Sequence, residues 1–316
     1  MDKISFKIRN FFSRVFTHKI KRIAEISDHF NSVTSLALLH DGRLASSSLD
    51  GTIKVFNLTN YECELTIRTD YVQYPFISVL PNGNIVACSN NGSIYIYSIS
   101  KKSFWLVHKI PSAHGNNKDN AWICIVIPIS NNRFASGGND KKIKIWNSNE
   151  LYNCISILEG SNSIVFSLLQ LKGKELLVSA SQDRNLRIWS LKTYQFTSVI
   201  TNVECVDTGG MMEIKENRVL VGGVGKITVV NINKLIIEKK YEDPWLGGLF
   251  SGCYLHDNEY IFTNLSGTFF IYDEVKNKIM YKIEKQHLFY VPYIYRINDK
   301  MIASGSVDRT IKIWSI

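Results

Sequence analysis

The chain has 316 residues, a formal net charge of +9, and 45% apolar and 12% aromatic residues. This length allows a large buried core, and no apolar run reaches the roughly 18 residues that a membrane-spanning helix needs. The six cysteines are scattered without a close pair, which argues against a disulfide framework or a zinc site. The composition therefore predicts a strand-rich globular protein of the cytoplasm or another reduced intracellular compartment, with no metal or cofactor.

The positive charge is concentrated at the N-terminus. Residues 1–22 hold seven Lys or Arg and one Asp, whereas the other 294 residues hold 30 bases and 27 acids. Because the body of the chain is nearly neutral, we expect no general nucleic-acid-binding surface.

Residues 1–19 have the pattern of a basic amphipathic helix. One apolar stripe at helical spacing contains Ile4, Ile8, Phe11, Phe12, Val15 and Phe16. Such a helix can lie on an anionic membrane surface, and these six side chains are the candidate membrane-binding residues. The alternative is that the helix packs on the outside of the protein or frays, because an exposed apolar stripe must be covered by something.

Residues 20–26 read as a single short strand, and the rest of the chain is a repeat. The last copy of its motif runs Gly-Ser-Val-Asp-Arg-Thr-Ile-Lys-Ile-Trp-Ser over residues 305–315, and six earlier segments resemble it. The turn position of the motif falls at residues 50, 91, 140, 183, 224, 266 and 308. A period of about 42 residues predicts one four-stranded unit repeated seven times, each with a tight hairpin before a strand that ends on a large aromatic residue in six of the seven copies.

These motifs resemble the WD-repeat β-propeller family. The resemblance covers residues 20–316 and implies an all-β fold: a seven-bladed β-propeller of four-stranded antiparallel blades, preceded by the short amphipathic helix of residues 1–19. It also implies that the strand at 20–26 completes the last blade beside residues 311–314, because the final repeat has only three strands and an open ring would expose a sheet edge.

The resemblance further implies a hydrogen-bonded network inside some blades, made from a Ser, the turn Asp, the strand-end Trp and a His in the preceding loop. The residues at matching positions are His29, Ser46, Asp50, His114, Ser136, Asp140, Trp146, Ser179, Asp183, Trp189, Ser304, Asp308 and Trp314. Repeats two, five and six lack both the Ser and the Asp, so we expect apolar packing to hold those blades.

Two further sets of residues are expected to be structural. Lys54, Lys144, Arg187 and Lys312 interrupt the apolar strands at one equivalent place, where their stems can extend toward an edge. Trp122 aligns with the apolar Val33 and is expected in the core.

No pattern of catalytic residues is present. The sequence lacks a nucleophile elbow, a zinc-protease helix motif, a phosphate loop and a dinucleotide fingerprint. The turn aspartates recur with the repeat period, so we expect them to have a structural role and not to act as catalytic acids or bases. We therefore expect no catalytic residue and no enzymatic activity.

Aromatic residues near the starts of the inner strands are candidates for partner binding. In this family such loops lie over the central channel, and aromatic and Arg side chains are frequent interface hot spots. The candidates are Phe30, Tyr71, Tyr74, Arg184, Trp245, Phe289, Tyr290 and Arg309. The alternative for about half of the aromatics is that each is the first buried residue of a strand. Trp245 is the strongest candidate, since it lies between a Pro and a Gly pair and aligns with no repeated core position.

The sequence thus predicts a non-catalytic scaffold or adaptor, a monomeric propeller that binds peptides or partner proteins within a larger assembly. One alternative is a peripheral membrane adaptor docked through residues 1–19. A less favoured alternative is an enzyme with a site at the mouth of the channel.

Overall fold

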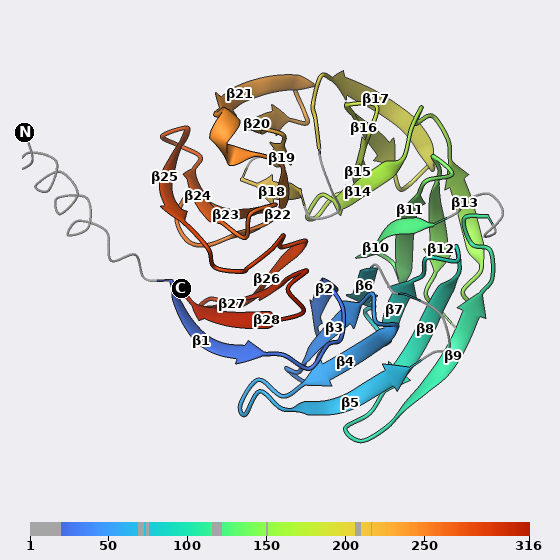
Figure 1. Cartoon of the computed structure of the whole chain (residues 1–316). Helices are drawn as coiled ribbons and strands as arrows, with labels where there is room; N and C mark the ends of the chain where they lie inside the picture. Colours follow the sequence, from blue (N-terminus) through green and yellow to red (C-terminus); the bar gives the residue numbers. More distant parts are fainter. Residues whose placement is uncertain are drawn as a thin grey trace, which may run out of the picture.

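The strands form a ring of seven four-stranded sheets (Figure 1). A computed structural model of the chain describes residues 20–68, 73, 76–115, 122–149, 151–205, 210–215 and 217–316. Each sheet is one blade, and in six of the seven sheets the strands follow one another in sequence from the inner edge to the outer edge, whereas in the seventh the outer strand is β1. The inner strands of neighbouring blades contact each other all around the ring.

The blades are numbered from the first complete repeat. Blade one contains β2 (Val33–Leu38), β3 (Leu44–Ser48), β4 (Thr52–Phe56) and β5 (Cys63–Arg68). Blade two contains β6 (Phe76–Val79), β7 (Ile85–Cys88), β8 (Ile94–Ile99) and β9 (Phe104–Ile110). Blade three contains β10 (Ile123–Ile129), β11 (Arg133–Gly138), β12 (Ile143–Asn147) and β13 (Cys154–Leu158). Blade four contains β14 (Val165–Gln170), β15 (Leu176–Ser181), β16 (Asn185–Ser190) and β17 (Gln195–Thr201).

Blade five contains β18 (Met211–Ile214), β19 (Arg218–Gly223), β20 (Lys226–Asn231) and β21 (Ile236–Glu242). A 3-10 turn, Pro244–Leu246, leads into blade six, which contains β22 (Leu249–Tyr254), β23 (Glu259–Asn264), β24 (Phe269–Asp273) and β25 (Lys278–Ile283). Blade seven contains β26 (Tyr293–Asn298), β27 (Met301–Gly305), β28 (Ile311–Ser315) and β1 (Lys21–Ile26).

The ring is closed by the first described strand. β1 pairs antiparallel with β28, with Arg22 opposite Trp314 and Ile26 opposite Ile311. Residues almost 300 positions apart in the sequence thus lie side by side (Figure 1). The pairing completes the sheet of blade seven and covers the edge that β28 would otherwise expose.

The hydrophobic core lies between the blades, where a strand of small residues in one blade meets the inner strand of the next. A Cβ atom added at Gly137 of β11 would lie 2.8 Å from the Val165 side chain of β14, and one added at Gly305 of β27 would lie 2.6 Å from Val33 of β2. These contacts leave no room for a side chain, so glycine at these two positions sets how closely the blades pack.

The predicted fold is confirmed: the chain is a seven-bladed β-propeller with its ring closed by the N-terminal strand. The predicted helix of residues 1–19, and with it the division of the chain at residue 20, lies outside the described residues. Over the part of the chain that the structure describes, no helix is long and apolar enough to cross a membrane.

Candidate functional site: the face of the tight turns

The tight turns between the second and third strands of each blade gather on one face of the ring, which we call the tight-turn face. The residue after the turn position has a left-handed backbone in all seven blades, with φ between 62° and 81°. Four of the seven are glycines, which adopt this conformation without strain. In blades three, four and seven the residue is a cation, and the exposed side chains of Lys141, Arg184 and Arg309 leave the turns there.

Beneath these turns, blades three and seven contain a complete chain of buried hydrogen bonds. In blade three, Trp146 Nε1 donates to Ser136 Oγ at 2.8 Å, Ser136 Oγ lies 2.7 Å from His114 Nε2, and His114 Nδ1 lies 2.8 Å from Asp140 Oδ1. Ser136 has one hydroxyl proton, which it donates to Nε2 of His114. Because Nε2 then acts as the acceptor, His114 is neutral and donates its Nδ1 proton to the Asp140 carboxylate.

Blade seven repeats this geometry with a histidine that the sequence analysis had not assigned to the network. His287 Nδ1 lies 2.8 Å from Asp308 Oδ2, His287 Nε2 lies 2.7 Å from Ser304 Oγ, and Trp314 Nε1 donates to Ser304 Oγ at 2.8 Å. The signal was present in the sequence, because His287 precedes Asp308 by the same 21 residues that separate His29 from Asp50.

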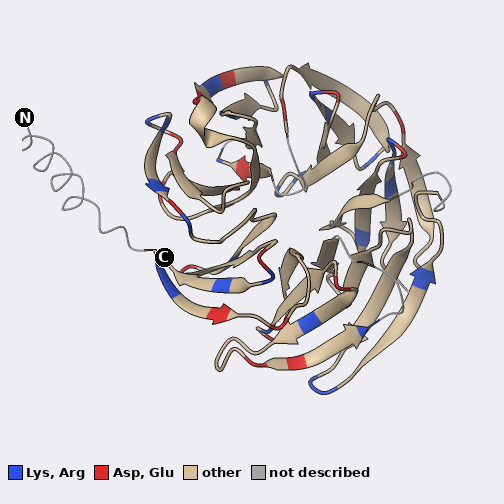
Figure 2. Ribbon diagram, in the orientation of Figure 1, with Lys and Arg blue, Asp and Glu red and all other residues tan. Residues whose placement is uncertain are grey.

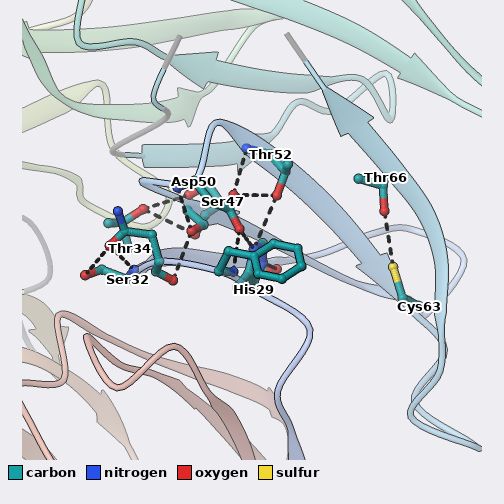
Figure 3. A network of polar contacts seen from close by, with 12 residues as sticks. His29, Ser32, Thr34, Ser47, Asp50, Thr52, Cys63 and Thr66 are labelled. Atoms are coloured by element: carbon teal, nitrogen blue, oxygen red, sulfur yellow. Dashed lines mark hydrogen bonds and ion pairs between the residues drawn. The ribbon is translucent and has the colours of Figure 1, made fainter. Parts of the chain in front are cut away.

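Blades one and four contain variants of the network. In blade one, His29 Nδ1 lies 2.9 Å from Asp50 Oδ2 (Figure 3). His29 Nε2 lies 2.7 Å from Ser46 Oγ, and Phe56 takes the place of the Trp. In blade four no His is present in the network, and Arg187 forms a buried ion pair with Asp183 at 2.8 Å while Trp189 Nε1 donates to Ser179 Oγ at 2.9 Å.

The buried groups of the network have shifted pKa values. Burial lowers the pKa of His114 and His287 below the ordinary 6.5, and the hydrogen bonds to their aspartates offset this only in part. Burial alone would raise the pKa of Asp50 and Asp308, but hydrogen bonds from His and Thr outweigh it and hold both values well below 3.8. In blades three and seven the network thus pairs an ionised carboxylate with a neutral imidazole.

Two lysines on the third strands of blades three and seven donate hydrogen bonds to the loops that contain the network histidines. Lys144 Nζ donates to the carbonyl of Ala113 at 2.5 Å, and Lys312 Nζ donates to the carbonyl of Gln286 at 2.8 Å. These carbonyls belong to the residues directly before His114 and His287. Both side chains therefore have a structural role. Lys54, the equivalent residue of blade one, is buried.

The network also fixes the backbone of exposed residues on the tight-turn face. Asp50 Oδ2 accepts a hydrogen bond from the N–H of Phe30 at 3.0 Å, and Asp308 Oδ2 accepts one from the N–H of Leu288 at 3.1 Å. Each is the residue directly after a network histidine, and each has an exposed side chain. A buried carboxylate thus holds an apolar side chain in solvent in the same way in blades one and seven.

Trp245 is presented by an equally well-fixed loop. Its side chain is 86% exposed, whereas the next residue, Leu246, is buried. Asp243 caps the 3-10 turn by accepting from Trp245 N at 3.0 Å, Gly225 N donates to Gly247 O at 2.7 Å, and Asn264 Nδ2 donates to Leu246 O at 3.0 Å. The loop is therefore bonded to the turn of blade five and to blade six, and the indole projects from a rigid backbone.

Hydrogen bonds between these loops and turns connect the exposed apolar residues into one arc. Gly267, in the turn of blade six, accepts from Gln286 N at 3.0 Å, and Tyr290 O accepts from Val307 N at 2.9 Å. Ser306 O then accepts from Val33 N of blade one at 3.0 Å. We call the exposed residues on these segments the apolar arc, which runs from blade five to blade one: Val224, Trp245, Leu265, Leu288, Phe289, Val307 and Phe30.

Three of the candidate partner-binding residues, Phe30, Trp245 and Phe289, belong to the arc. A fourth, Tyr290, is half-buried and its ring lies 4.3 Å from that of Phe250, so it supports the arc from below. Val224, Leu265, Leu288 and Val307 were missed, although an apolar residue inside an otherwise polar turn is a signal that the sequence carries.

The remaining candidates do not join the arc as one cluster. Arg309 lies in the turn of blade seven, next to Val307, but Arg184 lies in the turn of blade four, across the ring (Figure 1). The expectation that Trp122 is core was wrong: its side chain is 50% exposed, because β10 begins one residue later and Ile123 takes the buried position. Tyr71 and Tyr74 lie outside the described residues, as do Ile4, Ile8, Phe11, Phe12, Val15 and Phe16.

No disulfide joins any of the six cysteines, which all lie in the described ranges. Within the described ranges, no group of three or more His, Cys, Asp or Glu side chains is arranged to hold a metal ion.

Comparison with known proteins agrees with the fold. A family model described as "WD domain, G-beta repeat" matches residues 20–57, 107–147, 152–190 and 291–315, which include the strands of blades three and seven and the first three strands of blades one and four. The chain is 24% identical over 257 residues to the protein transport protein sec13 of Aspergillus fumigatus, an alignment that covers 67% of this chain and 81% of the relative.

Two other relatives have different names. Cell division control protein 4 of Saccharomyces cerevisiae is 23% identical over 94% of this chain and 39% of the relative. Nuclear distribution protein nudF of Aspergillus flavus is 38% identical over 21% of this chain and 14% of the relative. The chain thus combines repeats that match this family model over four regions with the seven four-stranded blades of a β-propeller.

Proposed function

We propose that this chain is a non-catalytic scaffold that binds a segment of a partner protein along the apolar arc of its tight-turn face, as one component of a larger assembly. The observation that supports this most strongly is Trp245, which is 86% exposed on a backbone fixed by hydrogen bonds to two blades. An exposed indole on a rigid turn gives a large contact area and loses little entropy on binding.

The residues around Trp245 support the same proposal. The arc supplies apolar contacts over blades five, six, seven and one, and Arg309 supplies an exposed cation beside Val307. The partner segment that fits best is apolar with an acidic residue, which Arg309 would bind through charge-assisted hydrogen bonds. Arg309 occupies a left-handed position where glycine would be unstrained, and this strain is compatible with a binding role.

The relatives support an interaction role more directly than any one cellular process. Their names refer to protein transport, nuclear distribution and cell division control, so the element they share with this chain is the propeller. A place in a protein-transport assembly is the narrower form of the proposal, supported by the sec13 alignment, which covers most of both chains. Six cysteines without a disulfide among the described residues are compatible with a cytoplasmic location.

Affinity capture from an extract tests the proposal with the full chain as bait. We expect Trp245→Ala to lower the affinity for the captured protein roughly thirtyfold, equivalent to about 2 kcal/mol, and to leave the melting temperature within a few degrees. The matched control is Trp122→Ala, which removes a half-exposed Trp from blade three, outside the arc. Equal capture by the wild-type chain and both variants would contradict the proposal.

A further inference from the structure

The outer strands of the blades are open sheet edges, and they differ in how they are protected. A charged side chain on an edge strand prevents the attachment of another strand. The outer strands of blades one, five, six and seven each contain at least two charged residues, whereas β13 and β17 contain none and β9 contains only Lys109. Blades two to four therefore lack the usual protection.

The edge of blade two is the most apolar of these. The first four residues of β9, Phe104 to Val107, are consecutive exposed apolar side chains. β9 pairs with β8 on one side, and no described strand pairs with it on the other. Exposed apolar runs of this kind mark interaction surfaces in soluble proteins.

A cavity adjoins this edge. It has a volume of about 850 Å³ and is lined by Val107 together with residues of the loop that joins β12 to β13, including Leu151 and Tyr152. Val107 is the residue that the β8–β9 ladder skips, since Tyr97 is opposite Leu106 and Ile96 is opposite His108. The bulge directs Val107 out of the regular pairing, and its side chain connects the apolar edge to the cavity.

The described residues of the cavity wall are rich in amides and include no charged side chain. Five asparagines line it: Asn82, Asn84, Asn132, Asn147 and Asn149. Asn84 Nδ2 donates to Tyr152 Oη at 2.9 Å and Asn82 Nδ2 donates to Ser148 O at 3.3 Å, which fixes blade two to the blade-three loop. Asn132 and Asn149 are exposed, and their side-chain amides bond to no other described residue. An amide offers a donor and an acceptor, which matches the needs of a peptide backbone.

The two blades that form this surface are strongly basic. Their described residues, 76–115, 122–149 and 151–158, contain seven Lys or Arg and one Asp (Figure 2). Arg133 and Lys142 form ion pairs with Glu175 and Glu159. Lys101, Lys102 and Lys109 form no ion pair with any described residue, and they flank the apolar run of β9 on both sides.

We propose that the β9 edge and the asparagine-lined cavity together bind an extended segment of a partner protein whose apolar centre is flanked by acidic residues. The segment would add to the open edge of β9, place an apolar side chain against Val107 and Leu151, and pair its acidic ends with the flanking lysines. This surface joins the outer edge of blade two to loops of blades two and three on the face opposite the tight turns, so it is separate from the apolar arc and does not depend on Trp245.

The charges argue against a second copy of the chain as the occupant. An antiparallel pairing that superimposes the apolar run on itself places Phe104 opposite Val107 and Lys102 opposite Lys109. A parallel pairing in register places each lysine opposite its own copy. Like charges directly opposite each other destabilise a strand pair, whereas an acidic segment removes this repulsion.

The test uses the full chain and a fluorescent peptide of alternating Val and Thr with two Asp at each end. We expect saturable binding by anisotropy, a loss of at least tenfold in Leu106→Glu, and a similar loss in the double variant Lys102→Glu/Lys109→Glu. A second peptide with Lys at each end should bind the double variant better than the wild-type chain. This charge swap separates recognition from simple damage to the fold.

The matched control is Phe196→Glu on β17. Phe196 is opposite Trp189 just as Leu106 is opposite Tyr97, and the two side chains are 52% and 49% exposed. We expect this variant to bind the acidic peptide like the wild-type chain. The proposal would be overturned by no saturable binding, by equal binding of Leu106→Glu, or by an equal loss in Phe196→Glu. Sedimentation showing a dimer that Leu106→Glu dissociates would also overturn it, in favour of a second copy.

Discussion

The carboxylate of Asp308 accepts a hydrogen bond from the backbone N–H of Leu288 at 3.1 Å, and the same oxygen lies 2.8 Å from His287 Nδ1. One buried group thus stabilises the inside of blade seven and positions an exposed residue of the apolar arc. Asp50 does the same for Phe30 in blade one. The stability of the blades and the shape of the candidate binding face therefore depend on the same hydrogen bonds.

The neutral histidines predict that acid destabilises the fold. Because burial lowers the pKa of His114 and His287, the unfolded chain binds more protons than the folded chain once the pH falls below about 7. The free energy of unfolding should therefore decrease between pH 7.5 and 5.5. Below about pH 4 the loss should steepen, because the pKa values of Asp50, Asp140, Asp183 and Asp308 are also lowered.

Urea denaturation at both pH values measures this effect. The double variant His114→Asn/His287→Asn should be less stable at pH 7.5 but should lose less stability on acidification than the wild-type chain. An equal pH dependence in the two proteins would show that these histidines do not cause it.

The ion pair of blade four predicts a large cost for one substitution and a partial rescue by a second. Asp183→Ala leaves the buried guanidinium of Arg187 without its partner and should cost on the order of 1–3 kcal/mol. Adding Arg187→Met removes the unpaired charge and should recover part of that loss. Ser266→Ala, at an exposed position in the turn of blade six, should cost little. Similar costs for Asp183→Ala and Ser266→Ala would contradict this view of blade four.

Because β1 closes the ring, we expect two N-terminal truncations to differ in their thermal unfolding. Deletion of residues 1–26 removes β1 and leaves β28 as an open edge, so the chain should aggregate or lose its cooperative melting transition. Deletion of residues 1–18 leaves β1 intact and should melt like the full chain. Indistinguishable melting curves for the two truncations would mean that the β1–β28 pairing contributes nothing to stability.

Membrane binding by residues 1–19 stays a prediction, separate from the two proposals above. The full chain should co-sediment with vesicles containing anionic lipid, less so at high salt, and deletion of residues 1–18 should abolish this. Phe12→Asp, which interrupts the apolar stripe at one position, is the finer variant. If the full chain and the deletion sediment equally, the segment is not a membrane anchor.

The sequence was sufficient for the fold because the repeat carries its own register. Each turn position fixes a hairpin, and the resemblance to WD-repeat propellers implied the β1–β28 closure because the last repeat has only three strands. His287 could have been found in the same way, from its spacing to Asp308. Trp122 was misplaced because the loop before β10 has a different length from those of the other repeats, so the start of the strand was uncertain by one residue.

The sequence did not predict the features that form between neighbouring blades. Asn84 bonds to Tyr152, 68 residues away, across the boundary between blades two and three. No local pattern predicts which loops of neighbouring blades face one another, so the cavity there was not foreseen. The apolar arc was found only in part for the same reason: the hydrogen bonds that join its loops and turns link different blades.

The most direct test of the central proposal is hydrogen–deuterium exchange of the full chain, free and bound to the protein that it captures. The account predicts slower exchange on binding in residues 244–249, 265–268 and 286–290, which carry four of the seven residues of the apolar arc, and little change in β17 on the outer wall of blade four. Protection confined to the outer strands or to the opposite face, with unchanged exchange in the arc, would contradict it.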